Sequence, residues 1–190
     1  MGNFDYFFPL LNAFAMRDGI ALGATGLVSF AAVLLSAPYG VGGMLLVASL
    51  IAWLCVLYYC SRRRMLMESG QGRAWHFGRS YVHALLSQLY GSAWVAFAVY
   101  VWFRFFDKGF FIGSMIAFLK RPDMQQYISE MEGRGLFEDM YRATGAEGIF
   151  GVFEALLHVP PETYSSMVVS WTLMAAPVVA LLIALVNRRV

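Results

Sequence analysis

The stretch SRRRMLMESGQGRAWHFGR, residues 61–79, separates two long apolar runs and decides how the rest of the chain is interpreted. It holds five arginines, which are Arg62, Arg63, Arg64, Arg73 and Arg79. Short loops rich in Arg and Lys stay on the cytoplasmic side of a membrane. We therefore predict that residues 61–79 form a basic inner loop and that this loop orients the helices on either side.

Composition places the chain among membrane proteins. Of its 190 residues, 59% are hydrophobic and 14% are charged, whereas a soluble domain has about 25% charged residues. The formal net charge of +2 is too small to indicate a nucleic-acid partner. The length allows a single membrane domain, residues 1–190, without a second independent core.

Four apolar stretches are candidates for helices that cross the membrane. The predicted spans cover about residues 19–37, 41–60, 81–106 and 163–186. Residues 3–16 are apolar but too few to cross, so we predict an interfacial lead-in, with Arg17 and Asp18 at the membrane surface. The first two spans are joined by residues 38–40, Pro-Tyr-Gly, which predict a tight outer turn.

An outer segment, residues 107–162, is predicted between the third and fourth spans. It contains nine acidic and five basic residues, the opposite balance to the inner loop. We expect short helices there, one starting at Asp123, with Gly133 and Gly145 as helix ends and residues 147–158 as an amphipathic piece.

Two parts of the outer segment allow more than one interpretation. The apolar residues 109–119 rise only about 16 Å as a helix, so they either extend the third helix outward or lie along the outer surface. Met, Phe and Tyr recur at helical spacing through the rest of the segment. Such faces either form a cap on the ends of the spans or provide a docking surface for a partner or a lipid.

Small residues at four-residue spacing predict close helix packing in two of the spans. Gly19 and Gly23, with Gly26 one turn further on, form such a set in the first span. Ala48 and Ala52 form the corresponding pair in the second. Helices in lipid associate through close van der Waals contact at small residues of this kind.

Several of these features together resemble a known family. They are the tight outer turn, the basic loop, Phe77-Gly78 opening the third helix, the long outer segment, and a last span closing on residues 184–186 before Arg188-Arg189. The chain is similar to the bacterial inner-membrane family catalogued as domain of unknown function 4199, found mostly in Bacteroidota. The resemblance implies a four-span fold and carries no catalytic signature.

The arginine cluster has two interpretations. A guanidinium group matches the oxygens of a phosphate, so Arg62, Arg63, Arg64, Arg73 and Arg79 are candidates for binding anionic or polyprenyl-phosphate headgroups. The same pattern also arises as a signal that sets topology and does nothing more.

Other candidates for chemistry are weaker. His76 and His83 are seven residues apart without a third ligand at suitable spacing, so we interpret them as packing residues and expect no metal. Glu154 and His158 are interpreted as a surface pair one helical turn apart. We expect no cofactor and no catalytic residue, although an enzyme using His83, Gln88 or the Glu154–His158 pair stays a third hypothesis.

The sequence thus predicts an all-α integral membrane protein with four transmembrane helices and an outer helical segment. The predicted span cores contain no Asp, Glu, Lys or Arg, and pumps and ion-coupled transporters mark their pathways with such residues. We therefore expect a bundle without buried charge, acting as a non-enzymatic accessory subunit of a larger complex. The expected location is a bacterial inner membrane with both termini cytoplasmic. The expected partners are membrane lipids and other membrane subunits or copies of itself, and the alternative function is lipid handling at the basic loop.

Overall fold

The computed structural model describes residues 4–70 and 76–188, and none of these residues lies in a strand. Four helices are long and apolar enough to cross a membrane, which makes the chain a multi-pass membrane protein and confirms the predicted fold class. These are α1 (Phe4–Ser36), α2 (Gly42–Gly70), α3 (Phe77–Val101) and α8 (Pro161–Arg188).

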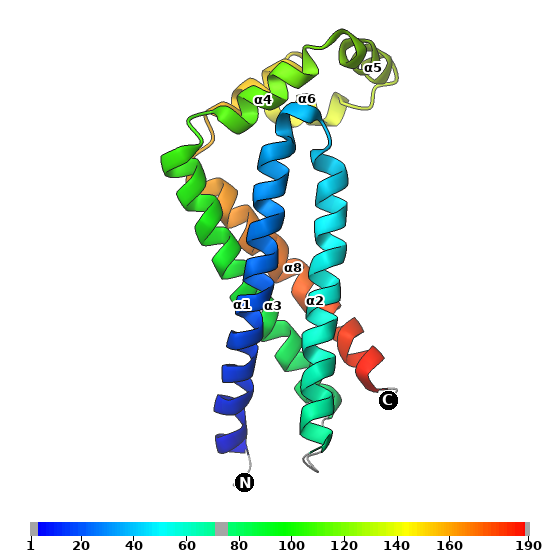
Figure 1. Ribbon diagram of the computed structural model, residues 1–190. Coiled ribbons are helices and arrows are strands. Elements are labelled where there is room, and N and C mark those ends of the chain that lie inside the picture. Colours follow the sequence, from blue (N-terminus) through cyan, green and yellow to red (C-terminus); the bar gives the residue numbers. More distant parts are fainter. Residues whose placement is uncertain (1–3, 71–75, 189–190) are drawn as a thin grey trace.

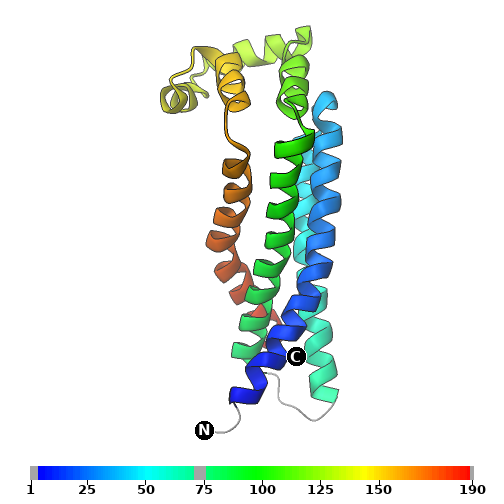
Figure 2. The same ribbon diagram turned by 90° about the vertical axis from the view of Figure 1, so that its left-hand side faces the viewer.

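The four long helices run antiparallel to one another in chain order (Figures 1 and 2). Both termini lie at one end, which we call the basic end because α2 carries its arginines there. The remaining helices lie at the opposite end, which we call the platform end. They are α4 (Phe110–Leu119), α5 (Pro122–Gly133), α6 (Glu138–Thr144) and α7 (Gly148–Leu157).

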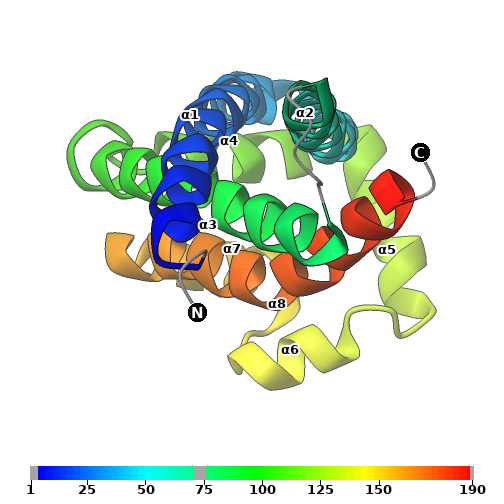
Figure 3. The same cartoon turned by 90° about the horizontal axis from the view of Figure 1, so that it is seen from below.

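Helix α3 is the centre of the bundle. Seen from the basic end, α1 and α2 lie on one side of α3 and α8 lies on the other (Figure 3). α3 packs most extensively on α1 and α8, whereas α2 packs mainly on α1 and has the least buried span. The buried core joins all four helices through Leu22, Leu57, Ala84, Ala180 and Ile183.

The first helix is longer than the sequence indicated. We predicted a separate lead-in over residues 3–16, but α1 is continuous from Phe4 to Ser36 and contains Pro9. Pro9 removes only one backbone donor near the start of the helix, which a long apolar helix tolerates. The chain then reverses through a 3₁₀ turn, Ala37–Tyr39, and through Gly40 with φ of 72°, a conformation that favours glycine.

The arginine stretch is also more helical than predicted. α2 continues to Gly70, so the first half of the predicted basic loop is helix. Arg, Met, Leu and Glu, which dominate this stretch, are good helix formers. Leu57, Ser61, Met65 and Glu68 continue one buried stripe at helical spacing, so the bundle supports the extension. Residues 71–75 lie outside the described part of the chain.

The helices of the platform end start and stop close to the predicted residues, since α5 ends at Gly133 and Gly145 directly follows α6. α3 ends in a π-helical turn, Trp102–Phe106, and α4 then lies across the platform end as a separate helix (Figure 1). Asp107 makes this change of direction. Its carboxylate accepts hydrogen bonds from the backbone N–H groups of Gly109 and Phe111, both at 3.0 Å, and from Trp102 Nε1 at 3.1 Å.

Candidate functional site

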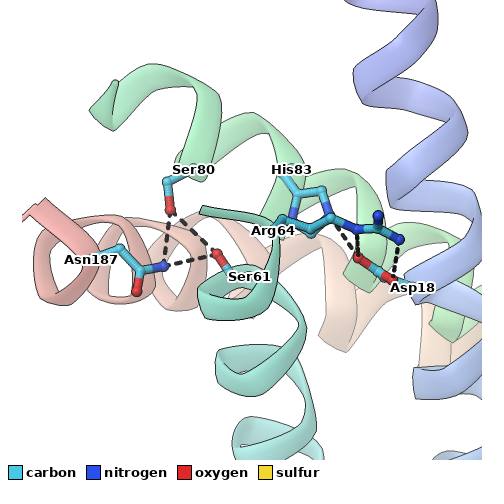
Figure 4. Close-up of polar contacts among 6 residues, drawn as sticks. All are labelled: Asp18, Ser61, Arg64, Ser80, His83 and Asn187. Carbon is cyan, nitrogen blue, oxygen red and sulfur yellow. Dashed lines mark hydrogen bonds and ion pairs between the residues drawn. The ribbon is translucent and has the colours of Figure 1, made fainter. Parts of the chain in front are cut away.

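Six polar side chains meet inside the bundle near the basic end, and we call them the basic-end junction (Figure 4). They come from all four long helices and are Asp18, Ser61, Arg64, Ser80, His83 and Asn187. Polar groups inside a membrane bundle are costly unless they are paired, and they mark candidate functional sites. The junction is therefore the candidate functional site of the bundle.

Asp18 and Arg64 form the charged half of the junction. Arg64 Nε donates to Asp18 Oδ2 at 3.0 Å and Arg64 Nη2 donates to Asp18 Oδ1 at 3.1 Å. The Asp18 side chain is only 13% exposed and the Arg64 side chain 11%, so little solvent reaches the pair. The Phe14 ring lies 4.4 Å from the guanidinium carbon of Arg64 and covers it. This fork-to-fork geometry is the strongest that an arginine and a carboxylate can adopt.

His83 brings α3 to the same carboxylate. Its Nε2 lies 3.0 Å from Asp18 Oδ2, and the histidine side chain is fully buried. An ionised carboxylate can only accept hydrogen bonds, so we assign the hydrogen to His83 Nε2. Asp18 on α1 is thus shared between Arg64 on α2 and His83 on α3.

The uncharged half of the junction lies one turn away. Asn187 Nδ2 donates to Ser61 Oγ at 2.9 Å and to Ser80 Oγ at 3.2 Å, and the two serine oxygens are 3.3 Å apart. Ser61 precedes Arg64 by three residues on α2, as Ser80 precedes His83 on α3. Residues at this spacing share one helix face, so two polar pairs of α2 and α3 face each other.

The position of the junction along the helices places it near a membrane boundary. Arg64 lies 22 positions after Gly42 on α2, which is a rise of about 33 Å at 1.5 Å per residue, close to the ~30 Å thickness of a hydrocarbon core. A bilayer that begins at the platform end of α2 therefore ends near Arg64. Water on the basic side is only a short distance from the junction.

The chemistry available to the junction is hydrogen bonding, ion pairing and proton exchange at His83. Within residues 4–70 and 76–188, no group of three His, Cys, Asp or Glu side chains is placed to hold a metal ion. Ser61 and Ser80 bond to an amide and to each other, and neither hydroxyl has a base within the junction's hydrogen bonds to activate it as a nucleophile.

The presence of this ion pair corrects one expectation. We expected a bundle without buried charge, and this was wrong because α1 and α2 extend beyond the predicted spans and bring Asp18 and Arg64 together. Asp18 had been interpreted as a membrane-surface residue beside Arg17. A signal for its burial did exist, since Asp18 lies three residues after Ala15 and four before Leu22, at the spacing of one buried helix face.

The five arginines of the basic stretch do not act as one group. Arg64 is engaged by Asp18, Arg63 is exposed, and Arg62 and Arg79 are partly buried. Arg73 lies outside the described residues. A phosphate-binding role for Arg64 would require breaking its ion pair with Asp18.

The small residues of the first span lie where α1 crosses α3. A Cβ added to Gly19 would come within 2.5 Å of Tyr90 Cβ, and one added to Gly23 within 2.9 Å of Trp94 Cβ. A Cβ added to Gly26 would come still closer to Val95 Cγ2. Ala48 and Ala52 are exposed instead, on the side of α2 that faces away from the bundle.

The other candidate residues are not brought together. His76 is exposed at the position that precedes α3, whereas His83 is buried. Glu154 and His158 are exposed at the platform end. Gln88, the remaining member of the enzyme hypothesis, donates from Nε2 to Ala84 O at 3.2 Å and to Ala176 O at 3.3 Å, and so joins α3 to α8.

The fold and the junction define a multi-pass α-helical membrane protein whose helices are tied together by buried polar contacts. A family model described as "Protein of unknown function (DUF4199)" matches residues 17–189, and the chain belongs to this family. No curated protein and no solved structure matches the chain significantly.

Proposed function

We propose that this protein is a non-enzymatic accessory subunit that packs against a larger complex in a bacterial inner membrane. The polar side chains of the basic-end junction support a role in packing, since they bond to one another across the helices. The basic-end junction ties all four helices together, and Tyr90 Oη donates to Asn12 Oδ1 at 2.6 Å between α3 and α1. Groups used in this way stabilise a shape and are not available to a substrate.

The observation that carries the proposal is the outward face of α2. Ala48 and Ala52 are one turn apart and both exposed, on the least buried of the four spans. In lipid, a face with small residues allows another helix to approach closely. The larger apolar side chains beside it, among them Met44, Val47 and Ile51, are also exposed and would surround such a contact.

The test is to fill this face without disturbing the fold. Replacing Ala48 and Ala52 together with Leu should reduce the recovery of a partner membrane protein in mild detergent. Ala175→Leu is the matched control, because Ala175 is exposed on α8, away from this face. Unchanged assembly of the α2 variant, or equal loss in the control, would contradict the proposal.

A second candidate function is the binding of anionic lipid headgroups at the basic end. In this proposal the basic end and both termini are cytoplasmic. Arg63 is exposed, and Nη1 of Arg62 is buried without a hydrogen-bond partner among the described residues. Anionic headgroups attract such clusters by about 1 kcal/mol per basic residue. Arg62→Gln with Arg63→Gln should lower co-purifying anionic lipid, whereas Arg134→Gln, exposed at the platform end, should not.

A further inference from the structure

We propose that the basic-end junction is a proton-binding site, in which His83 takes up a proton and thereby strengthens the contact between α1 and α3. The ligand is a proton from the water on the basic side of the membrane. This inference is independent of the accessory role proposed above. It rests on the geometry around Asp18.

The shared carboxylate is the first support. Asp18 Oδ2 receives Arg64 Nε and His83 Nε2, both at 3.0 Å, while Oδ1 is occupied by Arg64 Nη2. The hydrogen bond from His83 therefore exists whether or not the ring is charged. A charged donor makes such a bond about twice as strong as a neutral donor does.

The second support is that His83 is a histidine. We call Asp18, Arg64 and His83 the triad. Histidine is the side chain whose charge ordinarily changes between pH 5 and 8. Asp18 and Arg64 already neutralise each other, so the charge of the triad changes from zero to +1 when His83 binds a proton. A site that changes its charge in this way inside a buried contact responds to pH through helix packing.

Charged groups of both signs surround Asp18, Arg64 and His83. Two further groups lie one turn toward the basic end, the buried Glu68 on α2 and the partly buried Arg79 on α3, and they carry opposite charges. α8 contributes the uncharged Asn187 to this region. Other charged or titratable side chains on the same turns are Arg17 on α1, Cys60, Arg62 and Arg63 on α2, and Tyr81 on α3.

A route for the proton is short. His83 lies six residues after the first residue of α3, which corresponds to about 9 Å along the helix axis. His76, which directly precedes α3, is exposed at the basic end. The junction therefore responds to the pH of the compartment that contains the basic end.

The test compares the full-length protein with His83→Gln in lipid nanodiscs between pH 8 and pH 5.5. Glutamine keeps an N–H donor but does not bind a proton. The thermal midpoint of the wild type should rise relative to the variant by roughly 2–4 °C as the pH falls, the shift that a 1 kcal/mol change gives in a chain of this size. His158→Gln, exposed on the platform, should show no such difference.

A stability difference that does not change with pH would mean that His83 has only a structural role, and a fall of the wild type relative to the variant would reverse the proposed direction. Either result overturns the proposal. Should His83→Gln fail to fold, ¹⁵N-histidine NMR of a His76→Gln/His158→Gln chain would report on His83 alone, since the chain has three histidines. Its imidazole signals must shift between pH 8 and pH 5.5, and unchanged signals would overturn the proposal as well.

Discussion

Asp18 and Arg64 are 46 positions apart in the chain, yet both carboxylate oxygens of Asp18 accept hydrogen bonds from the one guanidinium group. Two parallel bonds fix the direction as well as the distance between the side chains. α1 therefore cannot slide or rotate against α2 without breaking at least one of them. The apolar faces of two membrane helices, which lack directional contacts, do not provide this restriction.

Breaking this pair is expected to destabilise the bundle strongly. Asp18→Asn or Arg64→Gln leaves one buried charge without its partner, a change that costs about 3 kcal/mol or more. The double variant should cost less than the sum of the two, because it buries no lone charge at this contact. Unfolding in mixed detergent micelles measures all three changes.

Arg63→Gln is the matched control for this pair, because Arg63 is exposed on the adjacent position of α2. Its replacement should change the unfolding free energy by no more than about 0.5 kcal/mol. Strictly additive effects of the Asp18 and Arg64 substitutions would show that the two charges are not coupled.

Much of the architecture could be predicted because it depends on local patterns. Apolar runs of sufficient length gave the four long helices, and proline and glycine marked the helix limits of the platform. Pro122 begins α5, and Gly145, with φ of 68°, follows α6. Each of these signals acts within a few residues, so a single sequence contains all the information needed.

The basic-end junction could not be predicted in the same way, because it depends on which faces distant helices present to each other. Asp18 and Arg64 each follow an exposed arginine, Arg17 and Arg63, and so looked like surface residues. Their burial requires that α2 stays helical past Cys60, so that the face with Arg64 is turned toward Asp18 on α1. Local sequence does not specify the relative rotation of two helices.

The crossing of α1 and α3 gives a second prediction. Gly19→Ala would place a Cβ at 2.5 Å from Tyr90 Cβ and at 3.2 Å from the carbonyl oxygen of Ser87, so the helices must move apart. Overpacking of this kind costs about 1–3 kcal/mol. The same unfolding assay should show the loss, together with weaker protection of α3 from amide exchange.

Gly113→Ala provides the control for helix propensity. Gly113 lies inside α4 and an added Cβ would meet no atom within 4 Å. The variant should be neutral or more stable by up to about 1 kcal/mol, because alanine favours a helix over glycine. An equal loss in both variants would mean that steric contact between α1 and α3 is not the cause.

The orientation in the membrane gives a third prediction. Ser69 near the end of α2 and Glu138 at the start of α6 are both exposed and belong to opposite ends of the molecule. With Cys55 and Cys60 replaced by Ala, an impermeant thiol reagent on intact cells should modify Glu138→Cys and leave Ser69→Cys unmodified. The reverse pattern would place the basic end outside the cell.

The platform gives the last prediction, which concerns the contact between α5 and α6. Tyr141 Oη donates a hydrogen bond to Glu132 Oε1. Partial burial of the phenol and the neighbouring carboxylate raise the pKa of Tyr141 to about 12, from an ordinary value of 10. A raised pKa means that the folded state favours the protonated phenol, so the contact stabilises the platform fully below pH 10 and loses its effect as the pH rises through about 12.

The difference in ultraviolet absorbance between the wild type and Tyr141→Phe isolates this one phenol among the ten tyrosines of the chain. Its midpoint should lie near pH 12. Glu132→Gln should move the midpoint downward, because the neutral amide no longer opposes the charge of a phenolate. Glu130→Gln is the control, since Glu130 is also exposed on α5 but makes no hydrogen bond to Tyr141 among the described contacts. A midpoint near pH 10 in the wild type, or equal shifts in the two glutamine variants, would show that Glu132 does not hold Tyr141.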